Sequence, residues 1–244
     1  MAVLRRRDLV ASTVALLLYG PTTKAGVISG HLPWEPTPPL DGPVAGGPWQ
    51  FFTAAEAAMV ESLADLLIPP DPQTPGGRDA GCAVFLDRQL AGAYGKAEGL
   101  YNLGPFQKGT EQQGPQEAGG PAEHYRKALA AIEQHCHEHH GKGWSDLVAA
   151  EQEAALHRLE AGTLVLAGVD GKAFFEQLLR DVQQGFFADP IYGGNRDMCA
   201  WKMIGFPGAR YDYRDWVDRH NERYPLPPVS IAGRPDWTAH GSGS

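Results

Sequence analysis

Apolar residues recur at intervals of three and four along several stretches of this 244-residue chain, and no two stretches alternate as paired strands do. The clearest stretch begins with Thr53 and Glu56, which have the spacing of a capping box, and stops at Pro69-Pro70. Because a helical period does not fit a strand, the pattern predicts a mostly α fold. Helices are predicted from Thr53 to Pro69, about Ala80 to Tyr94, about Ala122 to His140, near Ser145 to Gly162, roughly Lys172 to Phe187, and near Tyr213 to Arg223.

The 30 glycines and 20 prolines are many for a helical protein. They predict an irregular helical domain with long Gly/Pro-rich loops and extended straps at both ends. We expect four parts: an export signal (1–25), a Pro/Gly-rich strap (26–49), a helical domain (50–224) and a Pro-rich tail (225–244).

Residues 1–25 have the composition of an export signal. Arginines precede an apolar run from Leu9 to Tyr19, which is too short to span a membrane comfortably. Arg6 and Arg7, in "RRRDLV", look like the twin-arginine form of the signal, whose pathway carries folded cargo. A general secretory signal and retention of the segment as an anchor stay open as alternatives, since no clear cleavage site follows. Export predicts a periplasmic location, which is an oxidising compartment.

The formal net charge of −8 argues against nucleic acid as a partner, because phosphate contacts need clustered Lys and Arg. Cys82, Cys136 and Cys199 are odd in number, so at least one lies outside any internal disulfide, and the sequence does not pair them. The chain has no CxxCH motif, so no c-type haem is attached to it.

GxSxG, HExxH and P-loop motifs are absent, so no catalytic or cofactor-binding residue is assigned. Histidines crowd in "QHCHEHH", and the candidate metal ligands are His135, Cys136, His139 and His140, in pairs four residues apart that could hold Zn or Cu. No matching pair elsewhere completes such a site, and a solvated helix end is the more ordinary interpretation. The cluster leaves a stand-alone periplasmic metal-binding protein as the alternative function.

The stretch from Phe186 to Tyr213 has no clean helical or strand period, yet it is rich in aromatic residues, glycine and mixed charge. Aromatic residues and Arg are typical of the buried centres of interfaces. Two interpretations stay open: the stretch folds back on the preceding helix as a small core of its own, or it meets another protein. The predicted partner interface consists of Phe187, Tyr192, Gly193, Gly194, Asn195, Arg196, Trp201 and Phe206.

With these residues in view, the chain resembles the gluconate 2-dehydrogenase subunit 3 family, the small subunits of periplasmic, membrane-associated sugar and sugar-acid dehydrogenases. The resemblance lies in "FFTAAEAAMVESLADLLIPPD", "DAGCAVFLDRQLAGAYG", "YNLGPFQKGTEQQGPQ" and "GFFADPIYGGNRDMCAWKMIGFPGA", and covers roughly Gln50 to Ala209. Its most specific part is "DPIYGGN" with "GFPGA". Cys82 and Cys199 are not part of the family pattern, so the resemblance implies no disulfide.

The resemblance implies a non-catalytic subunit of an oxidoreductase complex, with no redox centre of its own. The implied partners are a large flavoprotein, which holds FAD and oxidises D-gluconate to 2-dehydro-D-gluconate, and a multihaem c-type cytochrome, which carries haem c and passes electrons to ubiquinone. It also implies that the signal escorts the folded flavoprotein across the membrane, and that the chain meets the periplasmic face of the inner membrane through the complex.

Overall fold

The computed structural model describes residues 48–99, 104–107, 109–110, 119–210 and 213–232. The predicted export signal with Arg6 and Arg7, most of the predicted strap, and residues 233–244 of the predicted tail lie outside these residues. Within the described ranges the chain is helical and forms no β-strand, which confirms the predicted fold class. The elements are α2 (Ala54–Leu67), α3 (Cys82–Ala91), α4 (Pro121–His140), η2 (Trp144–Asp146), α5 (Ala149–Glu160), α6 (Gly171–Phe187), η3 (Pro190–Tyr192), η4 (Arg196–Met198), α7 (Cys199–Ile204) and η5 (Arg214–Trp216).

Local signals start and stop these helices. The Thr53 side chain accepts a hydrogen bond from the Glu56 N–H, and the Glu56 carboxylate accepts one from the Thr53 N–H, so the predicted capping box is present. Asp170 caps α6 by accepting from the Ala173 N–H at 3.0 Å. α4 ends at Gly141, whose φ of 69° is the left-handed conformation that glycine adopts without steric cost.

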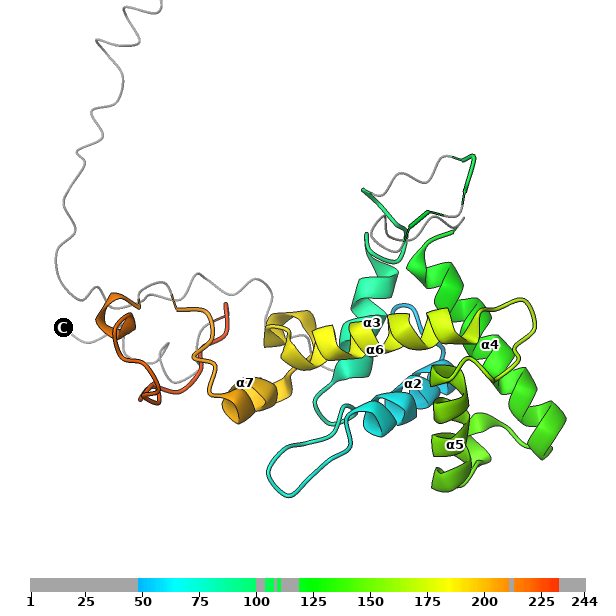
Figure 1. Cartoon of the computed structure of the whole chain (residues 1–244), viewed down its shortest axis with the longest axis horizontal. Coiled ribbons are helices and arrows are strands. Elements are labelled where there is room, and N and C mark those ends of the chain that lie inside the picture. The colour runs from blue at the N-terminus through cyan, green and yellow to red at the C-terminus, as the bar shows by residue number, and fades with distance from the viewer. Residues whose placement is uncertain (1–47, 100–103, 108, 111–118, 211–212, 233–244) are drawn as a thin grey trace, which may run out of the picture. The chain divides into compact units, whose positions relative to one another are not determined.

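Helix α6 is the centre of the packing. It packs against α3 and α5 and also contacts α4 and α2 (Figure 1). Leu178 and Val182 of α6 are completely buried, as is Leu63 of α2. Burying each such side chain contributes about 1.5–3 kcal/mol relative to leaving it exposed, so the apolar faces visible in the sequence assemble the core.

Two parts of the chain differ from the sequence prediction. Only a 3-10 turn, Arg214–Trp216, forms where a helix was predicted near Tyr213 to Arg223, so that prediction was wrong. Conversely, the stretch from Phe186 to Tyr213, which has no clean helical period in its sequence, contains α7. A helix of 6 residues completes too few turns to show a period, and its formation depends on contacts from elsewhere. In the described part of the chain, no helix is long and apolar enough to cross a bilayer.

A buried carboxylate fixes the start of the described chain to α3. Asp87 is fully buried and accepts hydrogen bonds from the backbone N–H groups of Gln50, Phe51 and Phe52 at 2.8, 2.9 and 2.9 Å. Arg126 of α4 makes a second contact with this segment, a cation–π interaction in which its guanidinium lies 4.1 Å from the centre of the Phe51 ring. The chain that follows the predicted strap therefore enters the helical domain at a fixed point.

Candidate partner interface

The turn after α6 approaches the helices so closely that only glycine fits. Gly193 has a φ of 98°, and a Cβ atom there would lie 2.9 Å from Cγ1 of Val84. A Cβ atom on Gly194 would lie 2.0 Å from the carbonyl oxygen of Gly185 on α6. These two glycines allow the backbone to pack against both α3 and α6, and both are buried.

Asn195 holds the two ends of this turn together from inside. Its side chain is fully buried, and its backbone has a φ of 46°, a left-handed conformation that Asn tolerates better than most residues. The amide nitrogen Nδ2 donates to the Ala188 carbonyl at 2.9 Å, and Oδ1 accepts from the Ala200 N–H at 2.9 Å. One side chain thereby joins the end of α6 to the first turn of α7.

Trp201 makes a further contact between α7 and the end of α6. It is 6% exposed, and its indole Nε1–H donates to the Phe187 carbonyl at 2.9 Å. Its ring meets Phe206 edge-on, with 5.2 Å between the ring centroids. The buried indole is therefore hydrogen-bonded and packed, as large aromatic residues require inside a protein.

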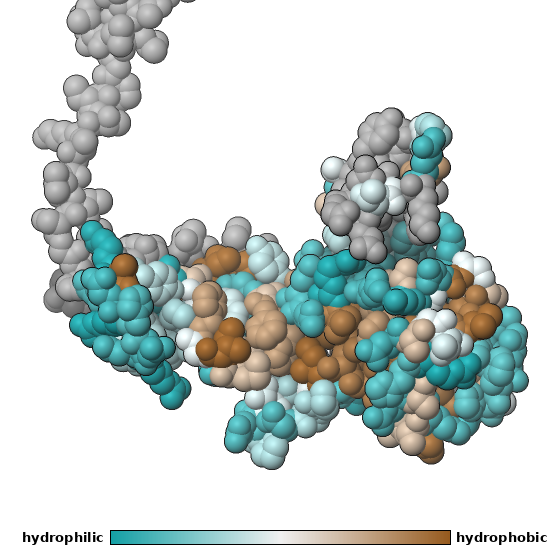
Figure 2. Space-filling view, in the orientation of Figure 1, coloured by the Kyte–Doolittle hydropathy of each residue, from teal (hydrophilic) through white to brown (hydrophobic). Residues whose placement is uncertain are grey.

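Several large apolar side chains of this segment are open to solvent. Of the twelve large apolar side chains exposed in the described part of the chain, five fall between 187 and 206, with exposures of 43% to 58%. Figure 2 shows apolar residues gathered over α7 and the neighbouring end of α6. We call these five side chains the apolar cluster: Phe187, Tyr192, Met203, Ile204 and Phe206.

The described part of the predicted tail folds back on this segment. The buried Asp189 accepts hydrogen bonds from the Ser230 hydroxyl at 2.7 Å and from the Ile231 N–H at 2.8 Å. Val229 pairs with Gly208 through an isolated parallel bridge. The tail around residue 230, which we call the C-terminal strap, is therefore fixed to the turn that follows α6.

Two grooves flank α7. One, of about 480 Å³, lies between α7 and the strap, and its lining includes Trp201, Lys202 and Arg223 but no carboxylate. The other, of about 610 Å³, lies between α7 and the loop after α2, and includes Gln73, Arg196 and Cys199. Open grooves beside an apolar cluster are features of a surface that another chain covers.

The comparison with family models decides the identity. The model of gluconate 2-dehydrogenase subunit 3 matches residues 54–208. The chain belongs to the gluconate 2-dehydrogenase subunit 3 family. No curated protein and no solved structure is significantly similar to it. The family consists of subunits of a gluconate 2-dehydrogenase complex, so membership implies that further subunits exist. The matched residues include both the helical core and the apolar cluster.

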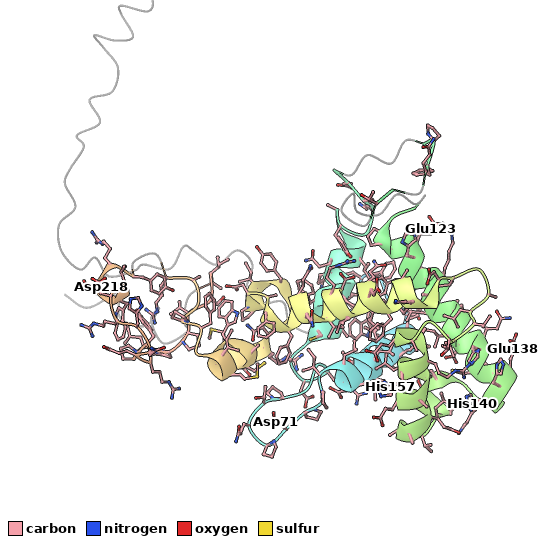
Figure 3. All side chains as sticks on the ribbon, in the orientation of Figure 1. Asp71, Glu123, Glu138, His140, His157 and Asp218 are labelled. Atoms are coloured by element: carbon pink, nitrogen blue, oxygen red, sulfur yellow. The ribbon has the colours of Figure 1, made fainter. Side chains whose placement is uncertain are left out.

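The histidine cluster of this subunit 3 protein does not converge on one point. His135 and His139 stack with ring centroids 4.0 Å apart, while Cys136 is buried in the core. His140, at the end of α4 in Figure 3, lies 3.7 Å from Glu151 of α5. Among the described residues, no three His, Cys, Asp or Glu side chains are grouped to hold a metal ion.

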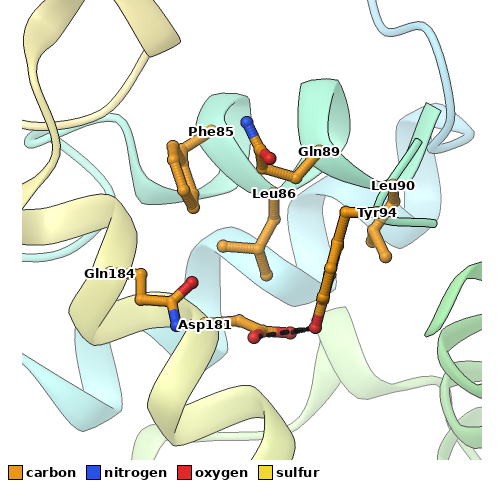
Figure 4. A pocket seen from close by; sticks show the side chains of 7 residues that line it. All are labelled: Phe85, Leu86, Gln89, Leu90, Tyr94, Asp181 and Gln184. Atoms are coloured by element: carbon orange, nitrogen blue, oxygen red, sulfur yellow. Dashed lines mark hydrogen bonds between the residues drawn. The ribbon is translucent and has the colours of Figure 1, made fainter. Parts of the chain in front are cut away.

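Another buried carboxylate of the subunit 3 chain lies beside the most enclosed cavity that we describe. Asp181 of α6 accepts a hydrogen bond from the hydroxyl of Tyr94 at 3.0 Å (Figure 4). It accepts another from the hydroxyl of Tyr125 at 2.9 Å. Burial raises the pKa of Asp181 above its ordinary value, although the two hydroxyls act in the opposite direction. The adjoining cavity, about 40 Å³, has room for only a water or two, whereas small-molecule sites measure roughly 300–1,000 Å³. Asp181 and its two tyrosine partners therefore stabilise the packing of the helices rather than bind a substrate.

The predicted interface residues of the subunit 3 protein divide into two groups. Gly193, Gly194, Asn195 and Trp201 are buried within the chain, while Phe187, Tyr192, Arg196 and Phe206 are exposed. The segment thus has a small core of its own and also presents an apolar surface. Contact with another subunit stays a prediction for all eight. Sequence reasoning missed Met203 and Ile204, which only α7 brings to the surface, and it missed the role of Asp189, whose partners lie more than 40 residues away.

Proposed function

We propose that the chain is the non-catalytic small subunit of a membrane-associated, flavin-dependent sugar-acid dehydrogenase complex, needed for export and stability of the FAD-containing large subunit. In this proposal the large subunit oxidises D-gluconate to 2-dehydro-D-gluconate, and a multihaem cytochrome c subunit passes the electrons to ubiquinone. Membership of the subunit 3 family supports a role inside such a complex.

The observation that carries the proposal is the apolar cluster, held in place by the buried bonds of Asn195 and Trp201. Leaving five large apolar side chains in water is unfavourable, and burying them against a partner returns about 25 cal/mol for each Å² of apolar area. Stable interfaces between permanent partners bury roughly 2,000 Å² or more in total. We place the large flavoprotein subunit on this cluster.

A binding experiment tests the interface. The chain is co-expressed with the FAD-containing large subunit of the proposed complex, and a tag on the chain is used for copurification. Ile204→Asp with Phe206→Asp puts two charges into the apolar cluster, and the matched control is Val165→Asp, at a side chain that is 83% exposed outside the cluster. Loss of about 2 kcal/mol at each central position weakens binding roughly 30-fold per position. Equal recovery of flavoprotein by the double variant and the control would show that the cluster is not the interface.

A separate experiment tests export. Replacing both Arg6 and Arg7 by lysine preserves the charge but removes the twin-arginine pair. We expect the FAD-loaded large subunit to stay in the cytoplasmic fraction, whereas it reaches the periplasm with the native chain. Unchanged periplasmic flavoprotein would contradict the escort role while leaving the binding experiment to decide the interface.

A further inference from the structure

Two cysteines that are far apart in sequence each begin a helix, and the backbones just before these two helices meet. Cys82 is the first residue of α3, and Cys199 is the first residue of α7. The Arg196 N–H donates to the Ala80 carbonyl at 3.0 Å, which joins the backbone just before α3 to the backbone just before α7. A Cβ atom on Gly81 would lie only 2.6 Å from the Gly193 carbonyl oxygen. The two backbones are thus in direct contact on the N-terminal side of each cysteine.

The surroundings of the two thiols differ in a way that suits stepwise oxidation. Cys82 is fully buried at this contact, whereas Cys199 is partly exposed and lines the groove of about 610 Å³. The Cys199 thiol also points to Oδ1 of Asn195, at 3.7 Å, so its position is held by the same amide that organises the turn. A reagent in the groove therefore meets Cys199, whereas the buried Cys82 does not line that groove.

The electrostatics of the thiols agree with this placement. Burial raises the pKa of Cys82 to about 12, and the charge of Cys199 is the next largest contribution. Cys136 is different, since burial and Glu133 raise its pKa to about 11 with no contribution from another thiol. The contact between the backbones just before α3 and α7 makes Cys82 and Cys199 the candidate pair, and all three thiols are free in the structure.

We propose that Cys82 and Cys199 are a disulfide-forming pair, which closes when the folded chain meets a disulfide oxidant and then ties α7 to the start of α3. The Cys199 thiolate attacks one sulfur of the oxidant R–S–S–R and forms a mixed disulfide. The leaving thiolate R–S⁻ takes up the proton that Cys199 lost and departs as R–SH. The Cys82 thiolate then attacks the Cys199 sulfur and releases the second R–SH. Two thiols of the chain are oxidised, and one disulfide of the oxidant is reduced to two thiols.

The cross-link would hold the apolar cluster on the helical core. Closure requires the two Cα atoms to lie within about 4.4–6.8 Å of each other, so the backbones that meet before α3 and α7 must bring them into that range. High thiol pKa values slow each exchange step at neutral pH, because little thiolate is present, and they also make both sulfurs poor leaving groups for reduction. The bond is therefore expected to form slowly and to persist. The inference does not depend on the proposed function.

Peptide mapping of the full chain tests the pair directly. The reduced chain is incubated with excess oxidised glutathione, and remaining thiols are blocked and counted after denaturation. Trypsin releases Cys82 in peptide 79–88, Cys199 in peptide 197–202 and Cys136 in peptide 128–142. We expect the native chain to fall from three free thiols to one, with peptides 79–88 and 197–202 joined.

Variants separate the pair from the isolated thiol. Cys136→Ser should still join the two peptides and retain no free thiol, whereas Cys199→Ser should join none. Oxidation should raise the Tm of the native chain and of Cys136→Ser by roughly 5–15 °C, and it should leave the Tm of Cys199→Ser unchanged. Three free thiols in the oxidised native chain, or a link that includes peptide 128–142, would overturn the proposal, and the native chain gives this answer even where a variant folds poorly.

Discussion

Replacing Asn195 by alanine should loosen the unit that presents the apolar cluster. The change removes the buried hydrogen bond to the Ala200 N–H, at about 1–3 kcal/mol, and the partly buried bond from Nδ2 to the Ala188 carbonyl, at about 0.5–1.5 kcal/mol. Alanine also tolerates the left-handed backbone less well than asparagine, which adds up to about 1 kcal/mol. The expected loss is about 1.5–5.5 kcal/mol, or roughly 3–22 °C in Tm for a chain of this length.

Thermal unfolding together with amide hydrogen exchange measures this effect. Asn221→Ala is the matched control, because Asn221 has the same left-handed backbone, with a φ of 61°, but is exposed. We expect faster exchange in residues 186–206 of Asn195→Ala, and a change below about 1 kcal/mol in Asn221→Ala. If the two variants lose equal stability, or if exchange in residues 186–206 does not change, the side-chain amide does not organise the segment as argued.

Three further predictions concern the buried carboxylates. Asp87→Ala removes the acceptor of three backbone N–H groups, so denaturant unfolding should show a loss of about 3–5 kcal/mol; a loss below 1 kcal/mol would refute the anchor. Because burial raises the pKa of Asp181 above 3.8, its contribution to stability is fully present below that pH and is lost as pH rises through the folded pKa. The urea midpoint of unfolding should therefore fall as pH rises across the acid range, and Asp181→Asn should remove this fall. The same pH profile in the variant and the native chain would argue against a role for Asp181. Asp189→Ala should release the strap at Ser230, which limited proteolysis would detect as faster cleavage between 225 and 232, and unchanged cleavage would show that Val229 alone is sufficient.

Much of the helical framework could be predicted because its signals are local. Thr53 and Glu56 form the expected capping box, and α4 ends at His140 as predicted, directly before the glycine at 141. The prediction failed where the local signal was weak or misleading. The charged stretch after Tyr213 has helical spacing but no apolar face to bury, and only a 3-10 turn forms there.

The candidate site was predicted less completely, since composition shows which residue types suit an interface but not which of them point outward. Phe187 and Tyr192 are exposed, while Trp201 from the same stretch is buried, because a single indole–carbonyl bond and the edge of Phe206 hold it inside. The neighbouring glycines serve close backbone contacts within the chain rather than an open turn.

The order of residues was enough to place the helices and their core faces, because capping and helical periodicity act between residues three or four positions apart. Only the folded chain could reveal that Asp87, Asp181 and Asp189 each have partners 35 or more residues away, or that the backbones just before Cys82 and Cys199 meet. Such partnerships depend on the path of the whole backbone, since the energy of a buried hydrogen bond or a thiol pair depends on distance in space and not on separation along the chain.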